Sequence, residues 1–277
     1  MKISIVTITY NAEKVLQRTL DSVRSQTYQY IEHLIIDGAS KDGTLELVRS
    51  YELGVKDYEV RVVSEPDRGI YDAMNKGLRM ATGDYIVYMN AGDTFHEKET
   101  LESLTPSLTP YPPLQRARGK PMAERGDSSL ITHHSSLPAV LYGDTNIVDS
   151  EGHFLRKRHL SVPDHLTWRS FKYGMLVCHQ AFYARLDIAR DIPYDLQYRH
   201  SADVDWCIRV MKEAERRHLT LQRVPGVVAD FMDGGNTSQN HRASLKERFT
   251  VMRRHYGLFT TLVMHVWFVI RSILSRP

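Results

Sequence analysis

Cysteine is scarce in this sequence of 277 residues, which contains only Cys178 and Cys207. Two cysteines cannot build a disulfide framework, and so low a count is typical of proteins from a reducing compartment. Basic residues exceed acidic ones by only 36 − 33 = 3, which is too small an excess to indicate a nucleic-acid-binding protein. Hydrophobic residues make up 42% and charged residues 25%, so we expect an ordinary globular fold.

Long hydrophobic runs are also missing. No stretch reaches the roughly 18–20 continuous apolar residues of a transmembrane helix. The longest candidate, Leu258–Leu274, is interrupted by His265 and Arg271. Met1–Tyr10 has one charge, Lys2, and no apolar segment of the usual length, so we expect no secretory signal.

Several nucleotide-binding and catalytic signatures are absent. The sequence has no GxxxxGK[ST] phosphate loop and no GxGxxG, and its first predicted strand runs into Thr9–Ala12 without a glycine. It has no HExxH, and without a GxSxG it offers no case for a Ser/His/Asp triad. These absences argue against a P-loop ATPase and a Rossmann dehydrogenase.

The first hundred residues alternate between strand-like and helix-like patterns. Strands are predicted at 2–10, 32–37, 60–64 and 84–90, and helices at 13–25, 44–51 and 71–81. This alternation indicates βαβ units and therefore a mainly parallel sheet flanked by helices. Because ligands of such sheets bind at the carboxyl ends of the strands, we expect Tyr10, Asp37 and Asn90–Asp93 to surround one crevice.

The pattern stops at Thr105–Pro138, which contains six prolines and a basic cluster. We interpret this segment as a flexible insertion, with an ordered lid as the alternative. Further strands are predicted at 139–148, 154–160, 178–184 and 219–228, and further helices at 201–216, 241–255 and 258–274. The expected organisation is an α/β domain over residues 1–240 and a C-terminal helical extension over 241–277.

Carboxylates follow two of the predicted strands, with Asp37 inside Ile35–Thr44 and Asp93 closing Tyr88–Asp93. A carboxylate in this position can hold a hard divalent cation that bridges to diphosphate oxygens. Each also suits an ordinary turn or helix cap. The shared crevice favours the binding role.

Seven short segments now carry a family resemblance. In chain order they read SIVTITYN (4–11), LDSVRSQT (20–27), DGASKDGT (37–44), DRGIYDAMNKG (67–77), ATGDY (81–85), CHQ (178–180) and ADVDW (202–206). Together they resemble the family 2 glycosyltransferases with the GT-A fold, strongly over 1–93 and more loosely over 141–233. The resemblance implies a GT-A-like α/β fold and a nucleotide-diphosphate sugar donor.

The resemblance also assigns donor-binding residues. It implies that Thr9, Tyr10 and Asp37 line the pocket of the nucleotide base, with Asp37 accepting a hydrogen bond from a ring N–H. It places Asp67 and Asn75 near the ribose and the diphosphate.

The metal motif departs from the family pattern. Asp93 resembles its last carboxylate, while Asn90 and Gly92 stand where the frequent Asp-Ala-Asp-Asp has two others. The same Asn-x-Gly-Asp variant occurs in a branch that resembles colanic-acid and other surface-polysaccharide transferases. The resemblance therefore implies Mn²⁺ or Mg²⁺ held by Asp93 and the donor diphosphate, with Asn90 offering a neutral carbonyl oxygen.

The catalytic base is expected from the last of these seven segments, 202–206. Asp203 matches the aspartate of the family's Glu-Asp motif, with Ala202 in place of the glutamate. An inverting transfer needs such a carboxylate within reach of the acceptor hydroxyl, and a metal to neutralise the departing nucleoside diphosphate. Asp203 also suits the N-terminus of a helix without any catalytic role. Asp205 is the alternative candidate for the base. The two residues cannot both serve, because side chains two positions apart on a helix point in different directions.

Weaker hypotheses concern the acceptor. His179 and Gln180 are candidates for contact with the acceptor or the diphosphate, and Asp144 for the acceptor alone. The glycine-rich Asp233–Ser238 is a candidate loop over the diphosphate. Each also has an ordinary structural interpretation.

The last 37 residues carry seven arginine or lysine residues and one acidic residue, Glu247, and end in the apolar 258–274. This composition favours an interfacial helix on an anionic membrane surface, with a helix packed on the domain as the alternative.

We therefore predict an inverting glycosyltransferase of surface-polysaccharide biosynthesis that uses a glycan or lipid-linked acceptor and no nucleic acid. We expect it in the cytoplasm, peripherally on the inner face of the cell membrane. The alternatives are a sugar-nucleotide-binding protein with weak or no catalysis, given Asn90 and Gly92, and a metal-dependent nucleotidyltransferase.

Overall fold

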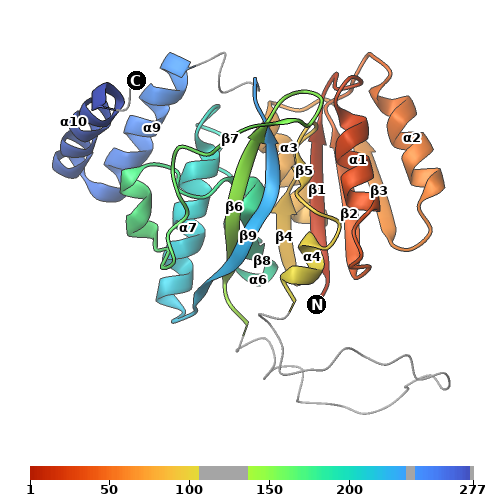
Figure 1. Ribbon diagram of the computed structural model, residues 1–277, viewed down its shortest axis with the longest axis horizontal. Coiled ribbons are helices and arrows are strands. Elements are labelled where there is room, and N and C mark those ends of the chain that lie inside the picture. The colour runs from red at the N-terminus through yellow and green to blue at the C-terminus, as the bar shows by residue number, and fades with distance from the viewer. Residues whose placement is uncertain (106–136, 235–240, 275–277) are drawn as a thin grey trace, which may run out of the picture.

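The computed structural model describes residues 1–105, 137–234 and 241–274. The predicted insertion at 105–138 and the segment 233–238 lie mostly outside these residues. Figure 1 shows one twisted sheet with helices on both sides and α9 and α10 at the end remote from α2.

The N-terminal half forms the parallel part of the sheet. Its strands, in spatial order, are β3 (Glu59–Ser64), β2 (Ile31–Asp37), β1 (Ile3–Thr9) and β4 (Tyr85–Tyr88). They are joined by α1 (Leu16–Arg24), α2 (Thr44–Gly54) and α3 (Ile70–Met80). Every residue of β1 and β2 is buried, because helices cover both faces, and this explains their continuous apolar runs. The predicted βαβ order is confirmed here.

The second half continues the sheet with mixed pairing. Beyond β4 follow β8 (Phe182–Arg185), β6 (Val140–Val148), β9 (Leu221–Met232) and β5 (Thr94–Phe95), with β7 (Phe154–Lys157) paired to β6. Among these strands β6 and β9 are parallel, and the other pairs are antiparallel. Short α4 (Thr100–Ser103), η2 (Trp168–Tyr173) and α6 (Leu186–Ala189) connect them.

The strand predicted at Cys178–Ala184 is partly wrong. His179–Ala181 forms a 3₁₀ turn, η3, and the strand β8 begins only at Phe182. In a strand, His179 and Gln180 would point to opposite faces of the sheet. In the turn, both side chains contact residues that follow β4, Asn90 and Asp93.

Three helices complete the fold: α7 (Ala202–Arg216), α9 (His241–Tyr256) and α10 (Leu258–Leu274). In α10, Thr261 and Met264 are buried, whereas Phe259 is 81% exposed and Val266 and Val269 are each 60% exposed. Much of the apolar surface of α10 is therefore exposed. Within the described ranges, no helix combines the length and hydrophobicity of a membrane span.

Candidate active site

The carboxyl ends of β1, β2 and β4 meet at one edge of the sheet, as predicted (Figure 1). The N–H of Gly38 donates to the Thr9 carbonyl (2.9 Å), and the N–H of Ala91 donates to the Ile8 carbonyl (3.1 Å). The loops after the three strands are therefore joined by main-chain hydrogen bonds, which fix the strand ends relative to one another.

Asp37 is held rigidly at the end of β2. Its carboxylate is fully buried and accepts hydrogen bonds from the Ser40 N–H (3.0 Å) and the Ser64 hydroxyl (2.6 Å). Beside it, the Asp67 carboxylate lies against Gly38, where a Cβ would come within 2.7 Å of an Asp67 oxygen. A side chain at position 38 would displace Asp67, so the glycine is required for this arrangement.

The end of β1 offers groups that the protein itself leaves free. Tyr10, directly after β1, is 63% exposed. The Thr9 hydroxyl is buried without a hydrogen-bond partner. Such an unpaired buried group is costly unless a ligand or water satisfies it.

His179 joins the end of β4 to the start of α7. The Asn90 amide N–H donates to Nε2 of His179 (3.0 Å). Because Nε2 accepts, the proton of the neutral ring is on Nδ1, which lies 3.6 Å from Oδ2 of Asp203. The chain of contacts from Asn90 through His179 to Asp203, called here the line Asn90–His179–Asp203, therefore connects the metal-motif loop with the predicted base.

Asp203 is also contacted from α3 and from its own helix. The Tyr71 hydroxyl donates to Oδ1 (3.1 Å), and so does the Val204 N–H (2.9 Å). Burial opposes ionisation, but the contacts with His179 and Val204 and the charge of Arg248 outweigh it and lower the pKa of Asp203. Asp203 is therefore ionised at neutral pH and able to accept a proton.

Asp93 is buried and bound on both oxygens. The Gln180 amide donates to Oδ2 (2.6 Å) and the Met232 N–H donates to Oδ1 (3.0 Å). Burial raises the pKa of Asp93 to about 6, although both hydrogen bonds act in the opposite direction. The side chain ties the loop after β4 to η3 and to the end of β9, and its ionised form would be stabilised by a nearby cation.

The oxygens at this loop fit a divalent cation that takes its other ligands from a diphosphate. Oδ1 of Asn90 is buried and has no hydrogen-bond partner. Each oxygen of Asp93 accepts one hydrogen bond and has a further lone pair. Mg²⁺ and Mn²⁺ prefer such oxygen ligands. Within the described residues, no group of three or more His, Cys, Asp or Glu side chains could hold a metal without further ligands.

Asn75 of α3 binds the segment that precedes α7, the helix with Asp203. Its amide donates to the Tyr194 carbonyl (2.9 Å) and accepts from the Tyr194 N–H (2.7 Å). The Tyr194 ring stacks on Tyr71 and Trp206, with centroids 5.5 and 4.9 Å apart. These contacts give no support to the donor contact predicted for Asn75.

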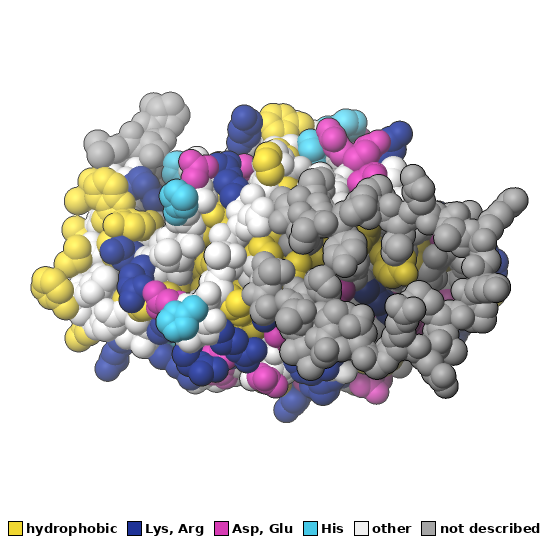
Figure 2. All heavy atoms as spheres, turned by 90° about the horizontal axis from the view of Figure 1, so that it is seen from below, with side chains coloured by type: hydrophobic (Ala, Val, Ile, Leu, Met, Phe, Trp, Pro, Cys, Tyr) yellow, Lys and Arg dark blue, Asp and Glu magenta, His cyan; other side chains and the backbone are white. Residues whose placement is uncertain are grey.

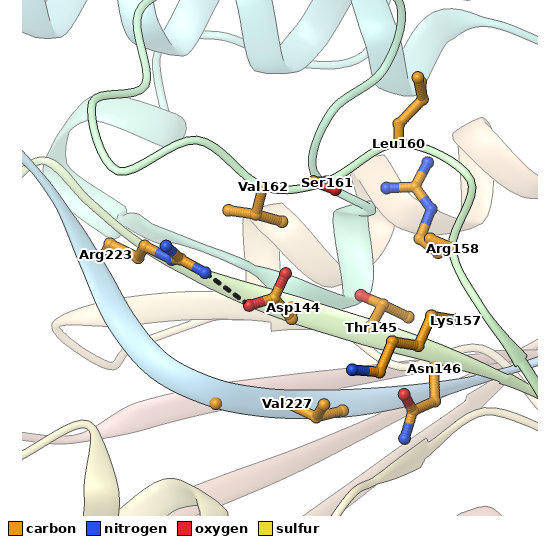
Figure 3. A pocket seen from close by; sticks show the side chains of 11 residues that line it. Asp144, Thr145, Asn146, Lys157, Arg158, Leu160, Ser161, Val162, Arg223 and Val227 are labelled. Carbon is orange, nitrogen blue, oxygen red and sulfur yellow. Dashed lines mark hydrogen bonds and ion pairs between the residues drawn. The ribbon is translucent and has the colours of Figure 1, made fainter.

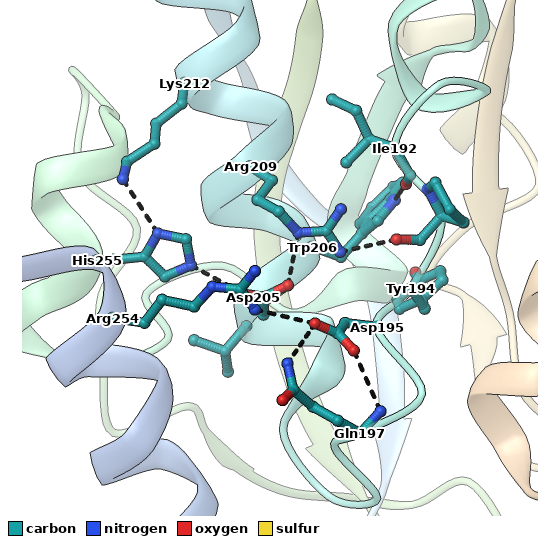
Figure 4. A network of polar contacts seen from close by, with 12 residues as sticks. Ile192, Tyr194, Asp195, Gln197, Asp205, Trp206, Arg209, Lys212, Arg254 and His255 are labelled. Carbon is teal, nitrogen blue, oxygen red and sulfur yellow. Dashed lines mark hydrogen bonds and ion pairs between the residues drawn. The ribbon is translucent and has the colours of Figure 1, made fainter.

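Asp205 is fully buried and lies in a polar network (Figure 4). Arg209 donates to Oδ2 (2.6 Å), and His255 of α9 donates to Oδ1 (2.8 Å). Lys212 in turn donates to the other nitrogen of His255 (3.1 Å). With both oxygens bound, Asp205 attaches α7 to α9, and the geometry does not favour it as the base.

A second attachment from α9 fastens the backbone before α7. The Glu247 carboxylate accepts the N–H groups of Arg199 (3.0 Å), His200 (2.7 Å) and Ser201 (3.1 Å). These are the last residues before the helix that carries Asp203.

Two groups near Asp203 were not singled out from the sequence. Tyr71 lies inside the quoted 67–77 segment but had no role of its own. In the sequence, Arg248 is one of the seven basic residues of 241–277. Its Nε is buried without a hydrogen-bond partner, and burial lowers its pKa although Asp203 acts in the opposite direction. No spacing in the sequence marks it.

The family model of glycosyl transferase family 2 matches residues 4–182. The chain belongs to this family and is a glycosyltransferase with the GT-A fold. Among curated proteins, it is 27% identical over 236 residues to a PGL/p-HBAD biosynthesis glycosyltransferase of Mycobacterium bovis, covering 85% of this chain and 78% of that protein. It is 28% identical over 214 residues to the amylovoran biosynthesis glycosyltransferase AmsB of Erwinia amylovora, covering 76% and 64%.

Solved structures show the same fold. The structure of S. aureus TarS 1–349 in complex with UDP-GlcNAc has a TM-score of 0.65 at 17% identity, covering 97% of this chain and 73% of that one. The mannosyltransferase PcManGT from Pyrobaculum calidifontis, in complex with GDP-Man and Mn²⁺, has a TM-score of 0.60 at 18% identity, covering 95% and 69%.

Proposed function

We propose that this glycosyltransferase inverts the anomeric carbon of a nucleotide-diphosphate sugar and transfers the sugar to a glycan or lipid-linked acceptor in surface-polysaccharide biosynthesis. The observation that carries the proposal is the line Asn90–His179–Asp203, which sets an ionised carboxylate beside the strand-end crevice. The named role of AmsB in amylovoran biosynthesis supports the polysaccharide context.

The transfer would proceed as one displacement. Asp203 takes the proton of the acceptor hydroxyl while the hydroxyl oxygen attacks the anomeric carbon. The bond from that carbon to the diphosphate oxygen breaks, the nucleoside diphosphate leaves, and the configuration inverts. Tyr71 and His179 orient the carboxylate, and Arg248 supplies positive charge near the departing diphosphate.

Donor binding would use the groups at the ends of β1 and β2. Tyr10 can stack on the nucleotide base, the Thr9 hydroxyl and Asp37 can bind its polar edge, and Asp67 can accept from the ribose. A divalent cation held by Asn90 and Asp93 would neutralise charge on the diphosphate.

A screen of nucleotide sugars tests the function directly. We expect one donor to raise the melting temperature in the presence of Mn²⁺, and turnover to release a nucleoside diphosphate. Release of pyrophosphate would indicate a nucleotidyltransferase instead. Binding without transfer or donor hydrolysis would indicate a sugar-nucleotide-binding protein.

Asn90→Asp is expected to lower the Mn²⁺ concentration needed for half-maximal donor binding, because it puts a charged oxygen where a neutral one stands. Asn90→Ala, which removes the oxygen, is expected to raise it. Calorimetric donor titrations at graded Mn²⁺ measure both effects. Gln29→Glu, the same change of amide to carboxylate at an exposed position, is the control. An unchanged Mn²⁺ dependence in both Asn90 variants would exclude Asn90 as a ligand.

We further propose that α10 lies on the cytoplasmic surface of the cell membrane. Its exposed side chains include Phe259, Val263, Val266, Trp267 and Val269. Figure 2 shows hydrophobic side chains gathered at the left-hand end of the molecule, where α10 lies in Figure 1. An apolar helix face with aromatic and basic residues suits the interface of an anionic membrane.

Changing Phe259, Val266 and Val269 together to aspartate is expected to abolish co-sedimentation with vesicles containing phosphatidylglycerol. The melting temperature should change little, because these side chains are mostly exposed. Leu53→Asp, at an apolar residue 74% exposed on α2, should leave vesicle binding intact. If the unchanged protein fails to bind vesicles, or the triple variant binds as well, the membrane proposal is wrong.

A further inference from the structure

A pocket of about 360 Å³ lies between β6, β7, β9 and the segment that follows β7 (Figure 3). Its volume is in the range of small-ligand sites. Its wall includes Asp144, the residue that sequence analysis suggested for the acceptor, with Lys157, Arg158 and Arg223. Three cationic side chains and one carboxylate thus line the pocket, and a second carboxylate, Asp164, pairs with Arg223.

The positive charge of the pocket is only partly neutralised. Arg223 donates to Asp144 (2.8 Å) and also pairs with Asp164, but its Nε is buried without a partner. Lys157 is exposed and forms no ion pair with any described residue, and Figure 3 shows its side chain at the pocket wall. Arg158 uses its two terminal nitrogens on main-chain carbonyls, which carry no net charge. An anion in the pocket would find unsatisfied donors and uncompensated charge.

The pocket is linked to the catalytic base through Arg158. Its guanidinium donates to the carbonyls of Met175 (2.8 Å) and Leu176 (3.1 Å). This stretch leads directly into His179, which contacts Asp203. The side chain of Arg158 therefore connects the wall of the pocket to the segment that leads into His179.

We infer that this pocket binds the acceptor through a phosphate group, with Lys157 and Arg158 contacting the phosphate and Asp144 a sugar hydroxyl. The inference rests on the proposed function and names the chemistry of its acceptor. Guanidinium and ammonium groups together suit phosphate oxygens, and a neutral sugar would not need the excess of cations. The phosphate can belong to a lipid carrier or to the glycan itself.

Calorimetric titrations with glucose 1-phosphate, methyl α-glucoside and geranyl phosphate test the inference on the full chain. We expect a phosphate compound to bind, the methyl glucoside not to bind, and Lys157→Glu to weaken phosphate binding about 10–100-fold, the value of a hydrogen bond to a charged group. Lys56→Glu, an exposed charge reversal after α2, is the matched control. Asn90→Ala should leave phosphate binding unchanged, because Asn90 does not line the pocket. Melting curves verify that each variant folds.

The outcomes separate the sources and the claims. Tighter binding of geranyl phosphate than of glucose 1-phosphate would support a lipid-borne phosphate, and the reverse a glycan-borne one. No phosphate binding, equal binding of methyl glucoside, or binding lost in Asn90→Ala but kept in Lys157→Glu would overturn the inference. Those results with glycosyl transfer intact would leave the proposed function standing. Phosphate binding at Lys157 without transfer from any nucleotide sugar would overturn the proposed function instead.

Discussion

Replacing Asp203 with asparagine is expected to lower kcat by about 10²–10⁴-fold, the usual contribution of a general base. Asparagine keeps an oxygen that can accept from Tyr71 and from the Val204 N–H, so the local structure should persist. It cannot take a proton from the acceptor hydroxyl. Donor affinity and melting temperature should therefore stay close to those of the unchanged protein.

Steady-state kinetics and donor titration on the same preparation measure the two quantities separately. A large loss of donor affinity with a small change in kcat would move Asp203 from proton transfer to donor binding. Tyr71→Phe provides a graded comparison, because it removes one hydrogen bond to Asp203 but leaves the carboxylate.

Replacing Asp205 with alanine is expected to lower the stability of the protein rather than its kcat. It should lower the free energy of unfolding by about 3 kcal/mol, because removing one partner of a buried polar pair leaves the other groups without compensation. His255 is 6% exposed and cannot be solvated in place, whereas Arg209, at 24%, can turn partly to water. Because Arg209 can regain water, we expect a loss at the lower end of the range of about 3–5 kcal/mol.

Urea unfolding measures this loss, and Glu213→Ala is the control on the same helix. Glu213 also pairs with two arginines, Arg216 and Arg217, but at the surface, so its loss should cost less than about 1 kcal/mol. If Asp205→Ala retains its stability and loses its activity, Asp205 rather than Asp203 is the base.

The convergence of the strand ends could be predicted from the sequence, because it follows from local patterns. Each strand of the first hundred residues ends in a polar residue, and parallel strands bring their ends to one edge. Asp37 and Asn90 therefore converge without any knowledge of distant contacts. The burial of β1 and β2 follows from the same continuous apolar runs.

The second half depends on pairings between segments far apart in the chain. β8 inserts between β4 and β6, and no local pattern specifies such a neighbour. The contacts of some individual residues could not be predicted for the same reason. Asn75 forms hydrogen bonds with Tyr194, which lies 119 residues later in the chain, and the charge of Arg248 acts on Asp203 from α9. Neither relation can be read from the sequence.

The attachment of Glu247 to the backbone before α7 has a consequence for the order in which the enzyme becomes complete. The acceptor for the Ser201 N–H stands 46 residues later in the chain. A polypeptide that ends after β9 contains all the strands of the donor crevice, yet three N–H groups at the entrance to α7 have lost their acceptor. The proposed base, Asp203, would therefore be fixed in place only after α9 has been added to the chain.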